Sequence, residues 1–194
     1  MCSPGKSDLK VAPVCRPLRG DAVAIRRQLQ VKTGQPLILV TMGGVSGDVF
    51  SLESMRGMGD VIFILSGSAD VLTLQGNLRL LPHHSGIYHP DLVAAADVVI
   101  GKLGYSTVAE TYQTATPFGY INRPKFRESK VLANFVNEHM AAQEITGREL
   151  HSGDWVTHVP ELINLPVKKL QEKNGADQVA AFLVSILDEL VKTF

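Results

Sequence analysis

Residues 36–44, Pro-Leu-Ile-Leu-Val-Thr-Met-Gly-Gly, hold the pattern that determines the fold class of this chain. The run from Leu37 to Met42 is almost entirely apolar and does not alternate with polar residues. An unbroken run of this length, preceded by proline and closed by two glycines, is typical of a strand that is covered on both faces, as in a parallel sheet. We therefore expect a buried strand followed by a glycine-rich turn.

Similar runs recur along the chain, with helical patterns between them. Strands are expected at 61–65, 77–81, 97–101 and 117–121, and helices after Asp21 and at 90–96, 106–114 and 128–142. This alternation predicts an α/β, Rossmann-like three-layer domain with a mainly parallel sheet. A last amphipathic helix, with its apolar stripe on Val179, Phe182, Leu183, Ile186, Leu190 and Val191, is expected over 176–194, docked on the sheet.

Composition narrows the organisation and the class of partner. Residues 1–20 contain three prolines and two glycines and are expected to be a linker or disordered tail, with a single domain over 21–194. Basic and acidic residues number 19 each, so no bulk charge favours nucleic acid. No apolar run is long enough for a membrane span, and the polar N-terminus has no signal-peptide core, so a cytoplasmic protein is expected.

Two glycine-rich turns follow expected strands and are candidate phosphate sites. The first contains Gly43, Gly44 and Ser46, and the second runs from Gly101 through Lys102 and Gly104 to Thr107, where a helix opens. Glycine lets a phosphate approach the backbone, and a helix N-terminus supplies free N–H donors. Neither turn matches G-x-G-x-x-G or a complete P-loop, so the alternative that both are merely tight turns stays open.

Glu110 allows two interpretations. Its carboxylate, one turn into the expected helix, would suit the two hydroxyls of a ribose. Thr107-Val108-Ala109-Glu110 also spells T-x-x-E, the capping-box pattern, in which Glu110 would bond only the start of its own helix.

The sequence contains no clear pattern for a metal site or for a catalytic nucleophile. His83, His84 and His89 lie close together, but their spacing fits no standard zinc pattern, and the two cysteines form no cluster. No metal is expected, and no Ser-His-Asp or Cys-His arrangement identifies a catalytic residue.

The stretch from Asp91 to Pro124, with its order of strand, small-residue turn, [ST]-x-x-E and Thr116-Pro117, resembles the C-terminal, donor-binding domain of GT-B glycosyltransferases. The segment LILVTMGG resembles the first strand and glycine loop of the same domain. Within this family the chain is most similar to the glycosyltransferase-like region of L-arabinokinase-type proteins, and more distantly to the peptidoglycan GlcNAc transferase.

The resemblance implies roles for particular residues. Glu110 would bind the ribose of a nucleoside diphosphate sugar, most simply of the UDP type, and Asn134 would lie near the sugar. The phosphates would meet Gly104, Tyr105, Ser106 and Thr107 on one side and Gly43, Gly44 and Ser46 on the other. Residues 126–131, Phe-Arg-Glu-Ser-Lys-Val, depart from the Asp-x-x-Gln set with which the family often grips the sugar.

Three functional hypotheses follow. The first is the donor domain of a glycosyltransferase whose acceptor half, an N-terminal Rossmann domain, is absent from this chain; that domain or a second copy would be its partner. The second is a non-catalytic domain with a decayed site that regulates or assembles with a sugar kinase. The third, a short nucleotide-binding enzyme with its own chemistry, lacks a candidate nucleophile.

Overall fold

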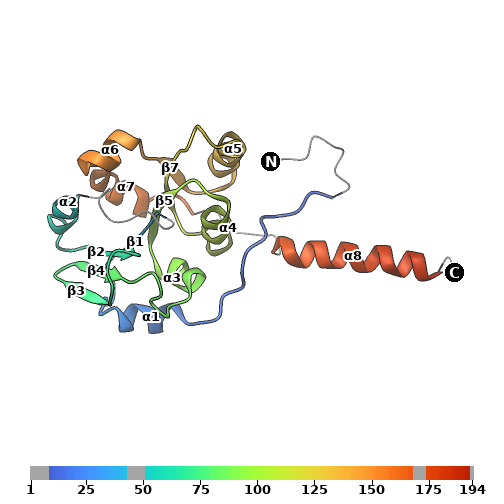
Figure 1. Cartoon of the computed structure of the whole chain (residues 1–194), viewed down its shortest axis with the longest axis horizontal. Coiled ribbons are helices and arrows are strands. Elements are labelled where there is room, and N and C mark those ends of the chain that lie inside the picture. Colours follow the sequence, from blue (N-terminus) through green and yellow to red (C-terminus); the bar gives the residue numbers. More distant parts are fainter. Residues whose placement is uncertain (1–8, 43–50, 168–173, 193–194) are drawn as a thin grey trace.

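The computed structural model describes residues 9–42, 51–167 and 174–192. Its centre is a seven-stranded sheet with helices on both faces (Figure 1). The strands are β1 (Leu37–Thr41), β2 (Ile62–Ser66), β3 (Thr73–Gln75), β4 (Leu78–Leu81), β5 (Val98–Lys102), β6 (Phe118–Ile121) and β7 (Ala142–Glu144). The helices are α1 (Ala22–Gln28), α2 (Leu52–Arg56), α3 (His89–Ala95), α4 (Tyr105–Thr114), α5 (Ser129–His139), α6 (Gly147–Ser152), the 3-10 helix η2 (Asp154–His158), α7 (Val159–Ile163) and α8 (Gly175–Lys192).

The order of the strands confirms the Rossmann-like α/β prediction. The sheet runs β3-β4-β2-β1-β5-β6-β7, and every pairing except β3 with β4 is parallel. Without the antiparallel edge strand β3, the remaining strands follow the doubly wound order 3-2-1-4-5-6. The chain leaves β1 in one direction for β2 and returns to its other side for β5. The topological switch point therefore lies between β1 and β5.

Strand β1 explains why the sheet needs cover on both faces. All five of its residues are buried. Leu37 and Leu39 pack into one apolar core with residues of α1, α3, α4 and α5, whereas Ile38 and Val40 pack into a second core with residues of α2, α6, η2 and α7. Each fully buried aliphatic side chain stabilises the fold by about 1.5–3 kcal/mol relative to exposure. The unalternating sequence of β1 is thus the direct cause of the three layers.

Two predicted elements end differently in the structure. The helix expected to reach residue 142 ends at His139, because Met140 adopts an extended conformation. Residues Ala142–Glu144 then pair with β6 as the edge strand β7, which the sequence analysis missed. Strand β3 was also missed, because three residues in a hairpin with β4 give no pattern of their own.

The prediction that the last helix docks on the sheet is wrong. Figure 1 shows α8 extending away from the sheet and its covering helices. Five of its apolar residues are more than half exposed, namely Leu183, Val184, Leu187, Leu190 and Val191. The amphipathic pattern identified the face that favours burial, but both faces of the sheet are already covered by other helices.

The residues at the start of α8, Asn174 and Gly175, are hydrogen-bonded to the described part of the N-terminal segment. Asn174 exchanges two hydrogen bonds with the backbone of Cys15, accepting at 3.2 Å and donating at 2.7 Å. The N–H of Gly175 also donates to the Pro13 carbonyl at 3.2 Å. From there the segment contacts α4 through Val14 and Arg16 and then α3 through Arg19, whose N–H donates to Asp91 at 2.8 Å.

Candidate functional site

The candidate site lies at the switch point, where ligands bind in doubly wound sheets. Strands β1 and β5 are neighbours, and Thr41 pairs with Gly101 at their carboxyl ends. A Cβ on Gly101 would lie 2.7 Å from the Thr41 carbonyl oxygen, so glycine is required for this close approach. The first predicted turn, with Gly43, Gly44 and Ser46, lies outside the described residues.

Glu110 is the central group of the site. It lies on α4, and its side chain is only 3% exposed. One carboxylate oxygen accepts from the Arg16 guanidinium at 2.6 Å, and the other lies 2.6 Å from Nδ1 of His89. A buried carboxylate is tolerated only when such partners compensate for the lost water. Both oxygens of Glu110 are therefore in use.

His89 and Thr41 extend this arrangement to the end of β1. His89 lies at the first turn of α3, and its Nε2 is 3.2 Å from the Thr41 hydroxyl. A carboxylate only accepts, so Nδ1 carries the proton shared with Glu110. In the neutral ring Nε2 then accepts from the Thr41 hydroxyl. The hydrogen bonds from Thr41 to His89 and from His89 to Glu110 orient one side of the carboxylate. Arg16 contacts the other oxygen from the solvent side.

These contacts set the protonation state of Glu110. Burial alone would raise the pKa of its carboxyl group, but the hydrogen bonds from His89 and Arg16 outweigh burial and hold the pKa below its ordinary value. Glu110 is thus a charged acceptor at neutral pH. It can exchange one donor for another, including a hydroxyl of a ligand.

The capping-box interpretation of Glu110 is wrong. Helix α4 begins at Tyr105 and its N-cap is Gly104, three residues earlier than a cap at Thr107 would require. No side chain caps this helix. Thr107 is instead inside the first turn, where its carbonyl accepts from the Thr111 hydroxyl at 2.7 Å. Glu110 is therefore free to face Arg16 and His89.

The first turn of α4 offers backbone donors beside Glu110. Its N–H groups have no side-chain acceptor because Gly104 carries no side chain. Ser106 is exposed and Thr107 is half-buried. The hydroxyl of Tyr105 accepts from the Val14 N–H at 3.0 Å, which holds the N-terminal segment against this end of the helix.

Lys102, at the end of β5, is a cation without an acidic partner among the described residues. Burial and then the nearby Arg123 guanidinium lower the pKa of its ammonium group. Two cations are thus close together at the ends of β5 and β6. Arg123 is only loosely paired, with Glu128 at 3.5 Å. An anion placed between them would relieve their mutual repulsion.

Asn134 lies apart from the groups around Glu110. It is exposed on α5 and lines a separate hollow of about 350 Å³ together with Asn122, Phe126, Arg127 and Lys130. Within the described ranges, no hydrogen bond joins it to Glu110, His89 or Lys102. The structure thus groups Lys102, Gly104–Thr107 and Glu110 at the switch point and places Asn134 on the neighbouring helix.

Two site residues, Arg16 and His89, were missed. Arg16 was assigned to a linker, and no periodicity could reveal that the segment crosses α4. His89 was predicted, with His83 and His84, to line a loop at a strand end, and a metal-binding role was the disfavoured alternative. Among the described residues, no group of three or more His, Cys, Asp or Glu side chains could hold a metal ion. The sequence feature that could have identified His89 is its position at the start of a helix that follows the end of a strand.

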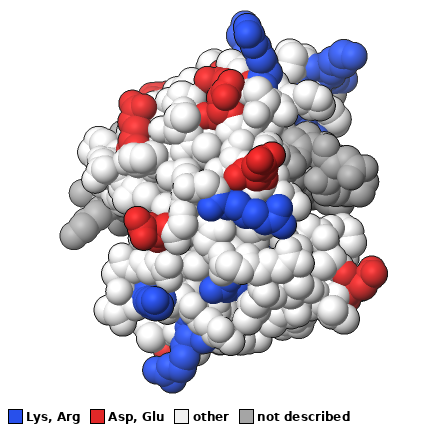
Figure 2. Space-filling model, turned by 90° about the vertical axis from the view of Figure 1, so that its left-hand side faces the viewer, with Lys and Arg blue, Asp and Glu red and all other residues white. Residues whose placement is uncertain are grey.

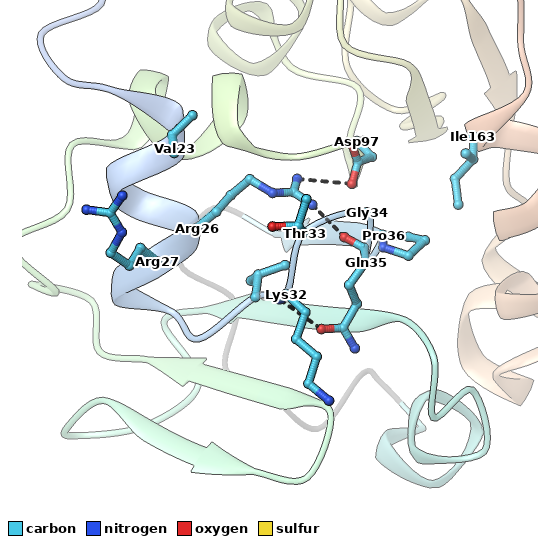
Figure 3. A pocket seen from close by; sticks show the side chains of 11 residues that line it. Val23, Arg26, Arg27, Lys32, Thr33, Gly34, Gln35, Pro36, Asp97 and Ile163 are labelled. Atoms are coloured by element: carbon cyan, nitrogen blue, oxygen red, sulfur yellow. Dashed lines mark hydrogen bonds and ion pairs between the residues drawn. The ribbon is translucent and has the colours of Figure 1, made fainter.

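A separate hollow lies at the other end of β1 (Figure 3). It measures about 680 Å³ and is lined by the loop before β1 and by α1. Here Arg26 bonds Asp97 at 3.1 Å and the carbonyl of Gln35. Its central polar groups thus satisfy one another, and it opens at the amino ends of the strands, so we do not take it as the ligand site.

Basic and acidic side chains are interspersed on the face shown in Figure 2, so this face has no large patch of one charge. Within the described part of the chain, no helix is both long and apolar enough to cross a bilayer.

The chain is similar to known proteins in sequence and in structure. No protein-family model matches the chain. L-arabinokinase from Arabidopsis thaliana is 26% identical over 157 residues, which cover 81% of this chain and 15% of that protein. The glycosyltransferase SnogD from Streptomyces nogalater is 19% identical with a TM-score of 0.49, and the match covers 95% of this chain and 51% of SnogD.

The glycotransferase of kitacinnamycin gives the structural match that supports the fold. Its TM-score is 0.52 at 17% identity, and the match covers 67% of this chain and 35% of that chain. This chain thus spans about half or less of each of these relatives. Its fold is an α/β Rossmann-like fold similar to part of the GT-B glycosyltransferases, which confirms the resemblance found in the sequence.

Proposed function

We propose that this domain binds a nucleoside diphosphate sugar, most simply a UDP-sugar, as the donor domain of a glycosyltransferase. The observation that carries the proposal is Glu110, a buried and charged carboxylate beside the uncapped N-terminus of α4 at the switch point. The two oxygens of its carboxylate suit the two ribose hydroxyls. One of these oxygens is held only by Arg16, whose side chain is 56% exposed. A ribose hydroxyl would replace Arg16 there.

The diphosphate would lie between the first turn of α4 and Lys102. Backbone N–H groups at a helix N-terminus favour phosphate, and the helix dipole adds about half a positive charge. Lys102 would supply a full charge that no described acidic side chain neutralises. Gly43, Gly44 and Ser46 would complete the site from the turn after β1. No residue of this chain is proposed as a catalytic base.

An acceptor-type Rossmann domain, or a second copy of the chain, is the partner that we propose. The exposed apolar face of α8 supports this, because an isolated helix in water gains little stability from its own hydrogen bonds. Catalysis would need such a partner to hold an acceptor beside the donor.

A non-catalytic role is the second candidate. The similarity to L-arabinokinase supports a domain that assembles with or regulates a sugar kinase. Arg16 on Glu110 also suits a site that no longer takes a donor.

Thermal unfolding in the presence of UDP, GDP, dTDP and ADP sugars tests the proposal. A ligand at 100 times its Kd stabilises a protein by about 2.7 kcal/mol. We expect one of these nucleotides to stabilise the chain and Gly104→Val to abolish the effect. A Cβ at Gly104 would meet only the Lys102 carbonyl oxygen, at 3.9 Å, so the variant should fold.

Gly147→Ala is the control, because Gly147, like Gly104, lies at the N-terminal boundary of a helix and a Cβ there meets nothing within 4 Å. The control should respond like the parent. If no nucleotide stabilises the parent, the donor-domain proposal fails and the non-catalytic role is favoured.

A further inference from the structure

The hollow beside α5 has a charge that a neutral sugar would not require. Residues 122–134 contain Arg123, Lys125, Arg127 and Lys130 but a single acidic residue, Glu128. The whole chain has equal numbers of basic and acidic residues, 19 each, so this excess is local. Glu128 is paired with Arg123. Arg127 and Lys130 line the hollow, and neither forms an ion pair with any residue that the structure describes.

The diphosphate alone does not account for these two cations. The first turn of α4 and Lys102 lie at the end of β5, where we propose that the diphosphate binds. Arg127 and Lys130 instead lie beyond the end of β6, Arg127 just before α5 and Lys130 in its first turn. A donor that extends from β5 toward β6 would therefore bring its sugar, rather than its phosphates, to them.

The neutral groups of the hollow suit a sugar. Asn122 and Asn134 line it, and their amides can both donate to and accept from hydroxyls. Oδ1 of Asn122 is buried without a hydrogen-bond partner in the described structure. An unsatisfied buried acceptor is unfavourable, so a hydroxyl donor that reached it would be stabilising. The size of the hollow, about 350 Å³, is in the range of small-molecule pockets.

The start of α5 adds to the positive potential. Helix α5 spans Ser129–His139, and no side chain caps its N-terminus. Its first turn therefore presents backbone N–H groups and the positive end of the helix dipole at the same hollow. Amides for hydroxyls, combined with two unpaired cations and a helix N-terminus, form a recognition set for a sugar that carries a carboxylate.

We propose that this hollow is a subsite for the carboxylate of a sugar acid, so that the preferred donor is a nucleoside diphosphate uronic acid rather than a neutral sugar nucleotide. The inference rests on the proposed function, because it takes the same donor and extends it from β5 to α5. The carboxylate would form charge-assisted hydrogen bonds with Arg127 and Lys130, which are stronger than bonds between neutral groups.

Isothermal titration with UDP-glucuronate, UDP-glucose and UDP tests the inference on the full chain. We expect UDP-glucuronate to bind about tenfold more tightly than UDP-glucose, and this ratio to fall as salt is added. The double variant Arg127→Ala/Lys130→Ala should bring the ratio to about one and leave UDP affinity nearly unchanged. Both side chains are exposed, so the variant should fold, which circular dichroism verifies.

Lys125→Ala is the matched control, since Lys125 is an exposed cation of the same segment that does not line the hollow. It should leave the ratio unchanged. Equal affinities for the two sugars, with UDP bound, would overturn the sugar-acid inference and leave the proposed function intact. If Lys125→Ala lost the preference for UDP-glucuronate equally, the preference would be a general charge effect. That result would also overturn the sugar-acid inference. Failure of all three ligands to bind would remove the proposed function itself.

Discussion

The sequence Thr-x-x-Glu occurs twice in helices of this protein, with opposite outcomes. At Thr146–Glu149 it forms a complete capping box, in which the Thr146 hydroxyl accepts from the Glu149 N–H and the Glu149 carboxylate accepts from the Thr146 N–H. At Thr107–Glu110 it forms none, and Glu110 is a buried group of the candidate site. From the sequence, a cap was predicted as an alternative only at Glu110, where the structure has none.

The difference comes from where each helix begins. Helix α6 begins at Gly147, so Thr146 is its N-cap. Helix α4 begins at Tyr105, because Gly104 adopts an extended conformation there and the strand β5 ends just before it. Thr107 and Glu110 are therefore carried one turn further into the helix. The motif specifies a cap only when the backbone places its threonine at the boundary, so the position of the preceding strand decides the role of the glutamate.

Glu110→Gln should produce the largest effect. Glutamine would direct an N–H₂ group at Arg16 or His89, both of which are donors, so we expect a loss of about 1–3 kcal/mol in the free energy of unfolding. Affinity for the nucleotide should fall about ten- to a hundredfold, because the ribose hydroxyls lose a charged acceptor. A denaturant melt and a UDP titration measure the two quantities.

Glu149→Gln is the control for this experiment and should bind UDP like the parent. If Glu110→Gln keeps both its stability and its affinity, Glu110 is not the ribose carboxylate and the contrast between the two motifs has no functional meaning.

Arg16→Ala should have the next largest effect on UDP affinity, and it should raise the affinity where Glu110→Gln lowers it. Arg16 must leave one Glu110 oxygen before a ribose hydroxyl can bond to it, so its removal should tighten UDP binding about two- to tenfold. The free energy of unfolding should fall by about 1–3 kcal/mol, because one oxygen of the buried Glu110 carboxylate loses its donor.

Arg19→Ala is the matched control for Arg16. Both guanidinium groups lie over the Tyr88 ring, at 5.2 Å for Arg16 and 4.1 Å for Arg19, but no bond links Arg19 to Glu110. Weaker UDP binding by Arg16→Ala would mean that Arg16 is a ligand contact rather than a group that occupies the site.

The same contrast shows how far the sequence could predict this protein. The strands with unalternating apolar runs were found because burial on both faces leaves a direct pattern, as in β1. Contacts between distant segments leave none, so the approach of Arg16 and His89 to Glu110 was missed. The exposed position of α8 was missed for a related reason. An apolar face predicts burial but does not identify the surface that covers it.

Acidification should lower the free energy of unfolding through the carboxylates of Glu110 and Glu149. We expect this effect to be smaller than that of the substitution at Glu110 or at Arg16. The pKa of Glu149 is lowered from 4.5 to about 2, by hydrogen bonds from Thr146 and then His158, and the pKa of Glu110 is also lowered. A lowered folded pKa gives stability that is present above the ordinary value and lost as the pH falls through the folded value. We expect denaturant melts to give a free energy of unfolding that decreases from pH 4.5 toward pH 2.

Comparing the parent with Glu149→Gln in the same melts isolates the contribution of that carboxylate. The variant should lose less stability over this interval, since it has one fewer group to protonate. An equal slope for both proteins would show that the Glu149 carboxylate does not contribute to the acid sensitivity.

The smallest effect is expected for Glu149→Gln at neutral pH, and it completes the contrast with Glu110→Gln. A capping box accepts glutamine, whose side-chain carbonyl can still reach the Thr146 N–H. The variant loses its charge interaction with His158, at 2.9 Å, but a pair this near the surface contributes only about 0–1 kcal/mol. We therefore expect the free energy of unfolding to fall by no more than about 1 kcal/mol, whereas Glu149→Ala, which also removes the acceptor, should lose about 0.5–2 kcal/mol more. Denaturant melts of the two variants measure this difference. If glutamine is as harmful as alanine, the charge of Glu149 is required and the capping box does not explain its role.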